Sequence, residues 1–323
     1  MTRQDAGLSP AFVETIAGLT AGSVATLVVH PLDIVKTRMQ IHRSSAATSQ
    51  TLTTISVIRG LTRTPHPVAA LYRGLTPNLL GNASSWASFF FFKARAENAI
   101  LAIKGQSPGG NVSPLTPQDY FVASGVAGMF TQVLTNPIWV LKTRMLSSDR
   151  GAVGAYPSMW AGAAQLLRTE GWCGFYRGLG ISLFGVSHGA VQFAVYDPLK
   201  QLYIKRRLKD ARESSLSDGH GKQWMTNEAT LVISSVSKLV AGTVTYPYQV
   251  IRSRLQNYDA DEQFGRGIRG VMRRTWMEEG WRGFYRGIIP GVVRVMPATW
   301  VTFLVYENAK FYLPQWSSDP SID

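Results

Sequence analysis

Pro31-Leu-Asp-Ile-Val-Lys-Thr-Arg38 recurs twice along the chain, as Pro137-Ile-Trp-Val-Leu-Lys-Thr-Arg144 and as Pro247-Tyr-Gln-Val-Ile-Arg-Ser-Arg254. A second motif follows each copy, as Tyr72-Arg-Gly74, Tyr176-Arg-Gly178 and Tyr285-Arg-Gly287. Both motifs return at intervals of roughly one hundred residues, so the chain contains three tandem repeats. We expect these repeats at residues 11–104, 117–205 and 226–313.

The chain combines a high net charge with a low fraction of charged residues. The 323 residues include 33 Lys+Arg and 20 Asp+Glu, a net charge of +13, yet only 16% of residues are charged and 45% are hydrophobic. Soluble domains usually have a larger fraction of charged residues, and disordered chains have a smaller fraction of apolar residues. The composition therefore disfavours both classes. The single cysteine and the lack of a Cys/His cluster exclude a disulfide scaffold and a structural zinc module, and no metal site is expected.

Six runs are nearly free of charge, and each has about the 20 residues that a helix needs to cross a bilayer. They are residues 11–29, 75–92, 120–141, 178–196, 229–251 and 287–306. Six buried helices of a large soluble protein are the alternative, but such helices would carry charged faces that these runs lack. The runs predict an all-α membrane protein with six transmembrane helices, two in each repeat.

The basic residues concentrate in the connections inside the repeats. Each connection lies between an odd and an even span, so all three face the same side of the membrane, and their basic content indicates the matrix or cytoplasm-like side. A nucleic-acid-binding protein would instead gather its basic residues on one exposed face. The ten residues before the first run are too short for a signal peptide, so no cleavable presequence is expected.

The complete pattern resembles the mitochondrial carrier family over nearly the whole chain. Its carriers are six-helix barrels of pseudo-threefold symmetry in the mitochondrial inner membrane, and they expose one central site alternately to either side. The resemblance implies a multi-pass monomer in a bilayer that includes cardiolipin, with no enzymatic activity and no resident cofactor. It also implies kinks in the odd helices at Pro31, Pro137 and Pro247, because proline removes a backbone donor.

In this family, an acid and a base of the proline motif pair between neighbouring helices and close the matrix side. This chain has Asp33 at the acidic position of the first copy but Trp139 and Gln249 in the other two. The cyclic pairing of the family implies three contacts: an ion pair Asp33–Lys142, a cation–π contact Trp139–Arg252 and a hydrogen bond Gln249–Lys36. Glutamine braces are implied at Gln40 and Gln256. The alternative is that the bases only anchor helix ends.

The opposite gate of the family follows the even helices. Asp197 with Lys200, and Glu307 with Lys310, fit its pattern, whereas Lys93 stands where an acid is expected. Asp197–Lys310 is then the one complete pair. Both gates therefore contain fewer ion pairs than the full family pattern. This gives the hypothesis that the free energy that stabilises each closed gate is low.

Two cations inside the spans indicate an anionic solute, because a charge within the membrane usually faces a cavity or a partner. Arg294 and Lys238 are these cations, and either binds phosphate or carboxylate well. A structural pairing of Lys238 is the alternative. The family's remaining substrate contacts fall at Gly81 and Asn82, and at Gly185 and Val186.

A finer resemblance is to the FAD/folate branch of the family, carried by residues 136–144, 183–189 and 246–250. It implies transport of FAD, with folate, a pyrimidine nucleotide or NAD as alternatives. A nucleotide-dependent enzyme is not favoured, because no phosphate-binding glycine loop is found. A channel or proton leak remains the other alternative, which solute uptake would distinguish.

Overall fold

The computed structural model describes residues 10–42, 52–104, 115–149, 151, 155–213, 226–258 and 260–316. Within these residues every regular element is a helix. The helices are α1 (Pro10–Ile41), α2 (Thr54–Thr62), α3 (Pro67–Leu71), α4 (Leu75–Ile103), α5 (Pro117–Ser147), α6 (Met159–Phe175), α7 (Leu179–Leu183), α8 (Val186–Glu213), α9 (Asn227–Val244), α10 (Tyr246–Gln256), α11 (Ala260–Phe264), α12 (Gly267–Gly283), α13 (Ile288–Val293) and α14 (Val295–Trp316).

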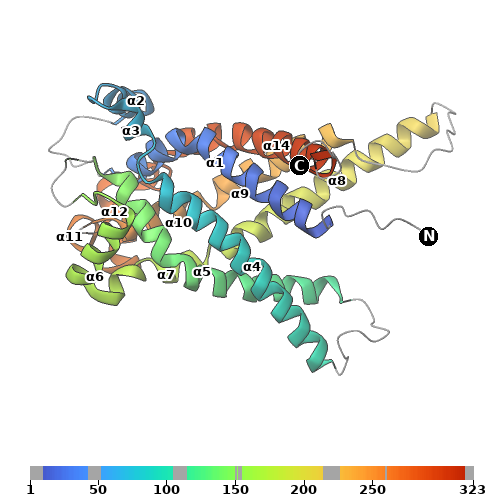
Figure 1. Cartoon of the computed structure of the whole chain (residues 1–323), viewed down its shortest axis with the longest axis horizontal. Coiled ribbons are helices and arrows are strands. Elements are labelled where there is room, and N and C mark those ends of the chain that lie inside the picture. The colour runs from blue at the N-terminus through green and yellow to red at the C-terminus, as the bar shows by residue number, and fades with distance from the viewer. Residues whose placement is uncertain are drawn as a thin grey trace.

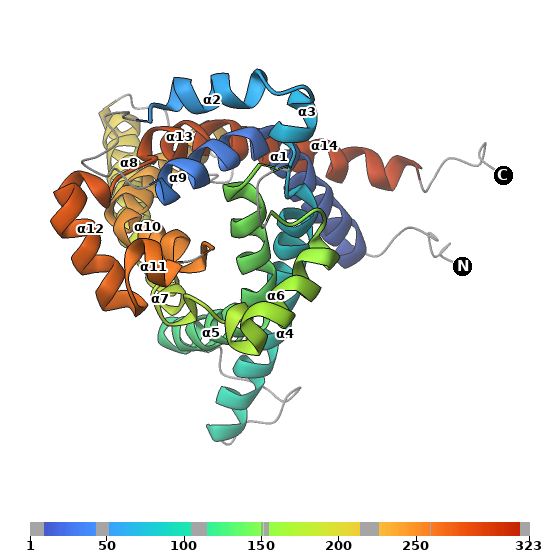
Figure 2. The same ribbon diagram turned by 90° about the vertical axis from the view of Figure 1, so that its left-hand side faces the viewer.

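Six long rods form a closed ring. They are α1, α4, α5, the pair α7–α8, the pair α9–α10 and the pair α13–α14, and each contacts the next around the ring, with α14 returning to α1. Figure 2 shows this barrel along its axis, with α2, α6 and α12 around the rim. In Figure 1 these three helices lie at one end of the molecule, and α8 extends toward the other. The prediction of an all-α barrel of three two-helix repeats is confirmed.

Apolarity alone marks only some of the six rods as membrane spans. Three segments in the described part are long and apolar enough to cross a bilayer, Ile16–Ile41, Leu179–Arg207 and Ile288–Tyr312. The bent pair Glu228–Val244 and Tyr246–Gln256 makes a fourth. The helices α4 and α5 are equally long but more polar, because polar side chains such as Asn136, fully buried in α5, bind neighbouring helices.

The prolines of the motif do not act alike. Pro31 and Pro137 lie inside the continuous helices α1 and α5. Pro247 instead follows a break at Thr245, where α9 and α10 meet at an angle of 60°. The third odd rod is therefore divided into two helices beside its proline, whereas α1 and α5 are each one helix through theirs, and kinks at Pro31 and Pro137 stay a prediction.

The glycine of each Tyr-Arg-Gly motif turns the chain into an even rod. Gly74, Gly178 and Gly287 all have φ between 71° and 79°, the left-handed region that glycine adopts without a steric penalty. At Gly287 a Cβ atom would also lie 3.0 Å from the carbonyl oxygen of Lys36. The motif thus packs the start of α13 directly against the backbone of α1.

In the second repeat, an ion network fixes the connecting helix to the end of α5. Arg144 donates to both carboxylate oxygens of Glu170 at 2.5 and 3.0 Å, and Arg177 donates to Glu170 at 2.8 Å. Burial favours a raised pKa for Glu170, but the hydrogen bond and charge of Arg144, with the charge of Arg177, lower this pKa below its usual value. The carboxylate therefore stays ionised and holds α6 to the barrel.

The third repeat contains the same network, and the first does not. Arg254 donates to Glu279 at 2.8 Å, and Arg286 lies 3.1 Å from the same carboxylate. In the first repeat His66 stands in place of the glutamate, and Arg38 reaches across to Asp149 of the second repeat at 2.6 Å. The repeats are thus alike in backbone and different in charge.

Candidate functional site

Asp33 binds two cations at the end of the barrel that carries the connecting helices. Its carboxylate lies 3.8 Å from the Lys142 ammonium of α5 and forms an ion pair with Arg294, at the junction of α13 and α14. The Asn78 amide of α4 donates to it at 3.4 Å. The contact expected with Lys142 is therefore present, and the sequence did not indicate the one with Arg294.

Lys36 and Gln249 form the second contact of this end. The ammonium donates to the side-chain oxygen of Gln249 at 2.8 Å and joins α1 to α10, as the resemblance implied. It also lies 5.6 Å from the centre of the Tyr246 ring. An amide therefore occupies the place where the family pattern has an acid.

The third contact differs from the expectation. The Trp139 ring lies 4.8 Å from the Lys142 ammonium of its own helix, and its indole N–H donates to Thr135 at 3.2 Å. No contact joins Trp139 to Arg252 among the residues that the structure describes. Residues three apart on a helix share one face, so Lys142 lies closer to the Trp139 ring than Arg252 of α10 does. The expected cation–π pair between Trp139 and Arg252 is wrong for this conformation.

The two glutamines link odd helices, as braces would. Gln40 accepts from the Ser253 hydroxyl at 2.8 Å and joins α1 to α10. Gln256 accepts from the Thr143 hydroxyl at 3.0 Å and joins α10 to α5. Together with the contacts of Asp33 and Lys36, they close this end of the barrel.

The residues of the opposite gate do not meet in this conformation. Asp197 and Lys310 are both exposed, and within the described ranges no ion pair joins them. Lys310 lies 5.8 Å from the ring of Tyr306 on its own helix, and Lys93 pairs with Glu97 at 3.6 Å. The expected Asp197–Lys310 pair is therefore not found between these two described residues. The roles of Lys200 and Glu307 stay predictions.

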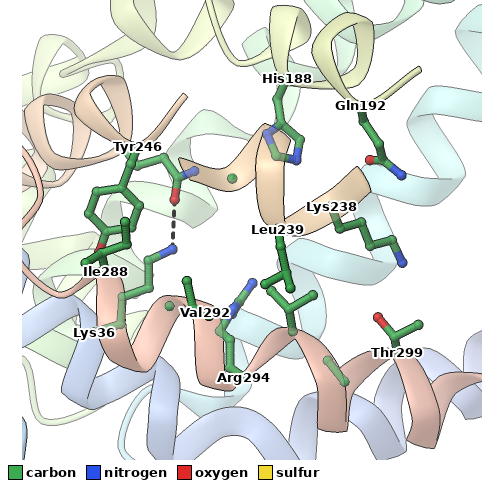
Figure 3. Close-up of a pocket in the computed structure, with 15 residues that line it drawn as sticks. Lys36, His188, Gln192, Lys238, Leu239, Tyr246, Ile288, Val292, Arg294 and Thr299 are labelled. Atoms are coloured by element: carbon green, nitrogen blue, oxygen red, sulfur yellow. Dashed lines mark hydrogen bonds between the residues drawn. The ribbon is translucent and has the colours of Figure 1, made fainter. Parts of the chain in front are cut away.

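A cavity of about 290 Å³ lies inside the barrel, beside the closed end. Its wall comes from α1, α8, α9, α10, α13 and α14. Figure 3 shows its polar side chains, which are Lys36, His188, Gln192, Lys238, Tyr246, Arg294 and Thr299, with Gln249 bonded to Lys36. Both cations expected to bind the solute thus line one cavity.

Lys238 lines this cavity and has no acidic partner among the described side chains. Its side chain is half-buried on α9, and in the described part of the chain no acid lies within ion-pair distance of it. A cation in such a position favours an anion from solution, because burial without a partner is costly. The alternative of a structural pair with Glu14 stays untested, because the Glu14 side chain lies outside the described residues.

Sequence reasoning missed the neutral part of the cavity wall. His188 donates or accepts a 2.9 Å hydrogen bond with Thr245, and Gln192 follows one helical turn later. The only signal was that His188 is the one ionisable residue of its apolar run. Tyr246 and Thr299 carried no distinguishing pattern.

Four expected substrate contacts lie elsewhere or are not described. A Cβ at Gly81 would lie 3.3 Å from the Trp139 ring, and Asn82 donates to Thr26 at 3.0 Å, so both serve the packing of α4. A Cβ at Gly185 would meet the Ser182 carbonyl at 2.8 Å, because this glycine forms the break between α7 and α8. The Val186 side chain lies outside the described residues. Their part in substrate binding stays a prediction.

Comparison with known proteins agrees with this geometry. The family model described as mitochondrial carrier protein matches three times, at residues 8–102, 113–207 and 223–316. The mitochondrial FAD carrier protein FLX1 of Saccharomyces cerevisiae is 41% identical over 318 residues, covering 94% of this chain and 98% of that protein.

Two plant transporters are more distant. The chloroplastic folate transporter 1 of Arabidopsis thaliana is 33% identical, covering 93% of this chain and 94% of its own length. The chloroplastic nicotinamide adenine dinucleotide transporter 1 of the same plant is 31% identical, covering 92% and 90%. All three relatives are similar over nearly their full length.

Proposed function

The chain belongs to the mitochondrial carrier family, and we propose that it carries FAD across the mitochondrial inner membrane by alternating access to one central cavity. The observation that supports this most directly is the cavity itself, where Lys36, Lys238 and Arg294 share a wall with hydrogen-bonding side chains. Cations suit the two phosphates of FAD, and arginine binds phosphate through two parallel hydrogen bonds. The relative with the highest identity among the three described is named an FAD carrier.

Arg294 and Lys238 are the proposed substrate-binding cations. They stand on α13–α14 and α9, so one extended anion can reach both. Gly81 and Asn82, with Gly185 and Val186, remain proposed contacts on the opposite walls. FAD acts here as the solute, and no resident cofactor is involved.

The two ends of the barrel act as alternating gates in this proposal. The matrix gate consists of Asp33, Lys36, Trp139, Lys142, Gln249, Arg252, Gln40 and Gln256. The opposite gate consists of Lys93, Asp197, Lys200, Glu307 and Lys310. Only one carboxylate serves the closed matrix gate, which supports a low energy of closing. A monomer surrounded by lipid, cardiolipin included, suffices for this cycle.

Folate is the second candidate, because a folate transporter is 33% identical over nearly its whole length. Its carboxylates would use the same cations, and a pterin ring would replace the flavin. NAD or a pyrimidine nucleotide would bind through phosphates, as FAD does. Substrate selection therefore has to be measured.

Uptake into proteoliposomes tests the function. Labelled FAD, FMN, riboflavin, folate, NAD and a pyrimidine nucleotide are offered to the wild type, and FAD is expected to be taken up with saturable kinetics. Arg294→Ala and Lys238→Ala should each lower this uptake at least 10-fold, since one charge-assisted hydrogen bond is worth about 1.5–3 kcal/mol. Arg273→Ala, an exposed arginine of α12, is the matched control.

Two results would reject the proposal. Robust folate uptake without FAD uptake would assign the carrier to folate. Proton flux without uptake of any solute would indicate a leak pathway instead.

A further inference from the structure

We propose that the phosphates of the transported anion bind at the matrix gate itself, on Lys36 and Arg294, where Gln249 and Trp139 have replaced acids. The gate residues then serve as substrate-binding residues as well. This inference deepens the proposed function and rests on it only in requiring a phosphate-bearing substrate.

Charge is unbalanced at the closed end of the barrel. Asp33 is the one carboxylate that the described residues place there, and it already pairs with Lys142 and Arg294. Lys36 is bonded only to an amide, and Arg252 lies within electrostatic reach of both lysines. Four cations therefore share one anion. A site with this excess favours an anionic ligand of more than one charge.

The unbalanced cations are open to the cavity. Lys36, Gln249 and Arg294 all line it, and Figure 3 shows the first and last of them on the same side of the space. The Lys36 ammonium has three donors and uses one for Gln249. The Lys36 stem lies beside α13, since a Cβ at Gly291 would be in ordinary van der Waals contact with it, at 3.6 Å.

The chemistry of these groups fits phosphate oxygens. A lysine ammonium acts as a point charge, and an arginine guanidinium binds two oxygens at once. A diphosphate at this place would supply the negative charge that a glutamate at position 249 and an aspartate at position 139 would otherwise supply. It would also compete with Asp33 for Arg294, which links arrival of the solute to loosening of the one buried ion pair of the gate.

The rival interpretation is that Lys36 and Gln249 are only a latch between α1 and α10. The two interpretations differ in what a charge at position 249 does. Under the latch interpretation, a glutamate merely strengthens the contact with Lys36. Under the present proposal, it also neutralises a cation that the substrate needs, so affinity for phosphate must fall.

The experiment compares Gln249→Glu with Gln249→Met, which has similar size and no charge. Thermal stabilisation of the purified carrier by FAD, ADP and inorganic pyrophosphate measures affinity, and FAD uptake in proteoliposomes gives KM. Gln249→Glu should weaken each diphosphate at least about 10-fold, the value of one charge-assisted hydrogen bond. Gln249→Met should alter the transport rate but change affinity by less than about 3-fold.

The other outcomes of this experiment separate a failure of the inference from a failure of the FAD proposal. Equal weakening in both variants, or unchanged affinity in Gln249→Glu, would overturn the inference. If pyrophosphate and ADP stabilise the wild type and FAD does not, the FAD proposal fails while the inference holds. If FAD is transported but no diphosphate responds to the glutamate, the inference fails while the function holds.

Discussion

Asp33→Asn removes one negative charge from the closed gate and keeps the shape of the side chain. The carboxylate is 8% exposed, pairs with Lys142 and Arg294, and accepts a hydrogen bond from Asn78. After the substitution both cations lose their common partner. The conformation described here loses both ion pairs of Asp33, whereas a conformation with this end open would lose little.

The size of the effect follows from burial. Removing one partner of a buried ion pair costs about 3–5 kcal/mol, and the cavity beside Arg294, which is 35% exposed, places this case near the lower value. About 3 kcal/mol corresponds to a fall in Tm of roughly 4–5 °C for 323 residues, because the unfolding entropy is about 2.1 cal/mol/K per residue. Asp149→Asn is the matched control, because Asp149 is 61% exposed and also pairs with an arginine, Arg38. An exposed pair contributes about 1 kcal/mol or less.

Tryptophan fluorescence during heating of the purified carrier measures both variants. Asp33→Asn should unfold about 4–5 °C below the wild type, and Asp149→Asn within about 1.5 °C of it. Adding Arg294→Gln should cost much less in the Asp33→Asn background than alone, since the partner is already gone. Equal shifts for the two aspartates, or strict additivity with Arg294→Gln, would show that the pair does not hold the gate.

Three further predictions concern other parts of the molecule. The lowered pKa of Glu170 means that its stabilising charge is fully present above about pH 4.5 and is lost as the pH falls through its folded pKa, so the Tm difference between wild type and Glu170→Gln should shrink from pH 7 to pH 3. Trp139→Asp places a second acid beside Lys142 and should slow FAD exchange in proteoliposomes, and an unchanged rate would contradict the low closing energy. Gly178→Ala forces a side chain into a left-handed turn and should cost about 1–2 kcal/mol of stability by thermal unfolding. Gly22→Ala, in a helix with open space around it, should cost nothing.

The repeat and the charge-free runs were sufficient to predict the barrel, because three matched proline motifs leave few other arrangements. The interruptions of the rods were not predictable in the same way. The break at Gly185 depends on the close approach of Ser182 and Tyr248, which tertiary packing determines. The break at Thr245 sits beside a proline, yet the equivalent prolines Pro31 and Pro137 leave their helices continuous.

The cations of the site were predictable because a charge inside a span is costly and therefore conspicuous. Neutral polar residues such as Gln192 cost little in a helix, so nothing in the sequence distinguishes a cavity position from a packing position. The pairing of Arg294 with Asp33 joins residues 261 positions apart, in the first and third repeats. The cyclic pairing of the family implied Lys142 as the partner of Asp33, and the structure contains that pair. The additional partner, Arg294, is brought to Asp33 only by folding.

Charge breaks the threefold symmetry in a regular way. The second and third repeats have no acid in the proline motif, and each uses a glutamate of its connecting helix to bind its own arginine. The first repeat has the reverse arrangement, with Asp33 in the motif and no acid at His66. Ion pairs therefore tie the second and third odd rods to their own repeats, and tie α1 to its neighbours α5 and α14. In the proposed cycle, opening the matrix side separates α1 from α5 and α14, and it also strains the ion pair between Arg177 of the second repeat and Asp261 of the third, at 3.1 Å. An anion that binds Arg294, as we propose, would compete with Asp33 for the guanidinium and would therefore act on the contact between α1 and α14.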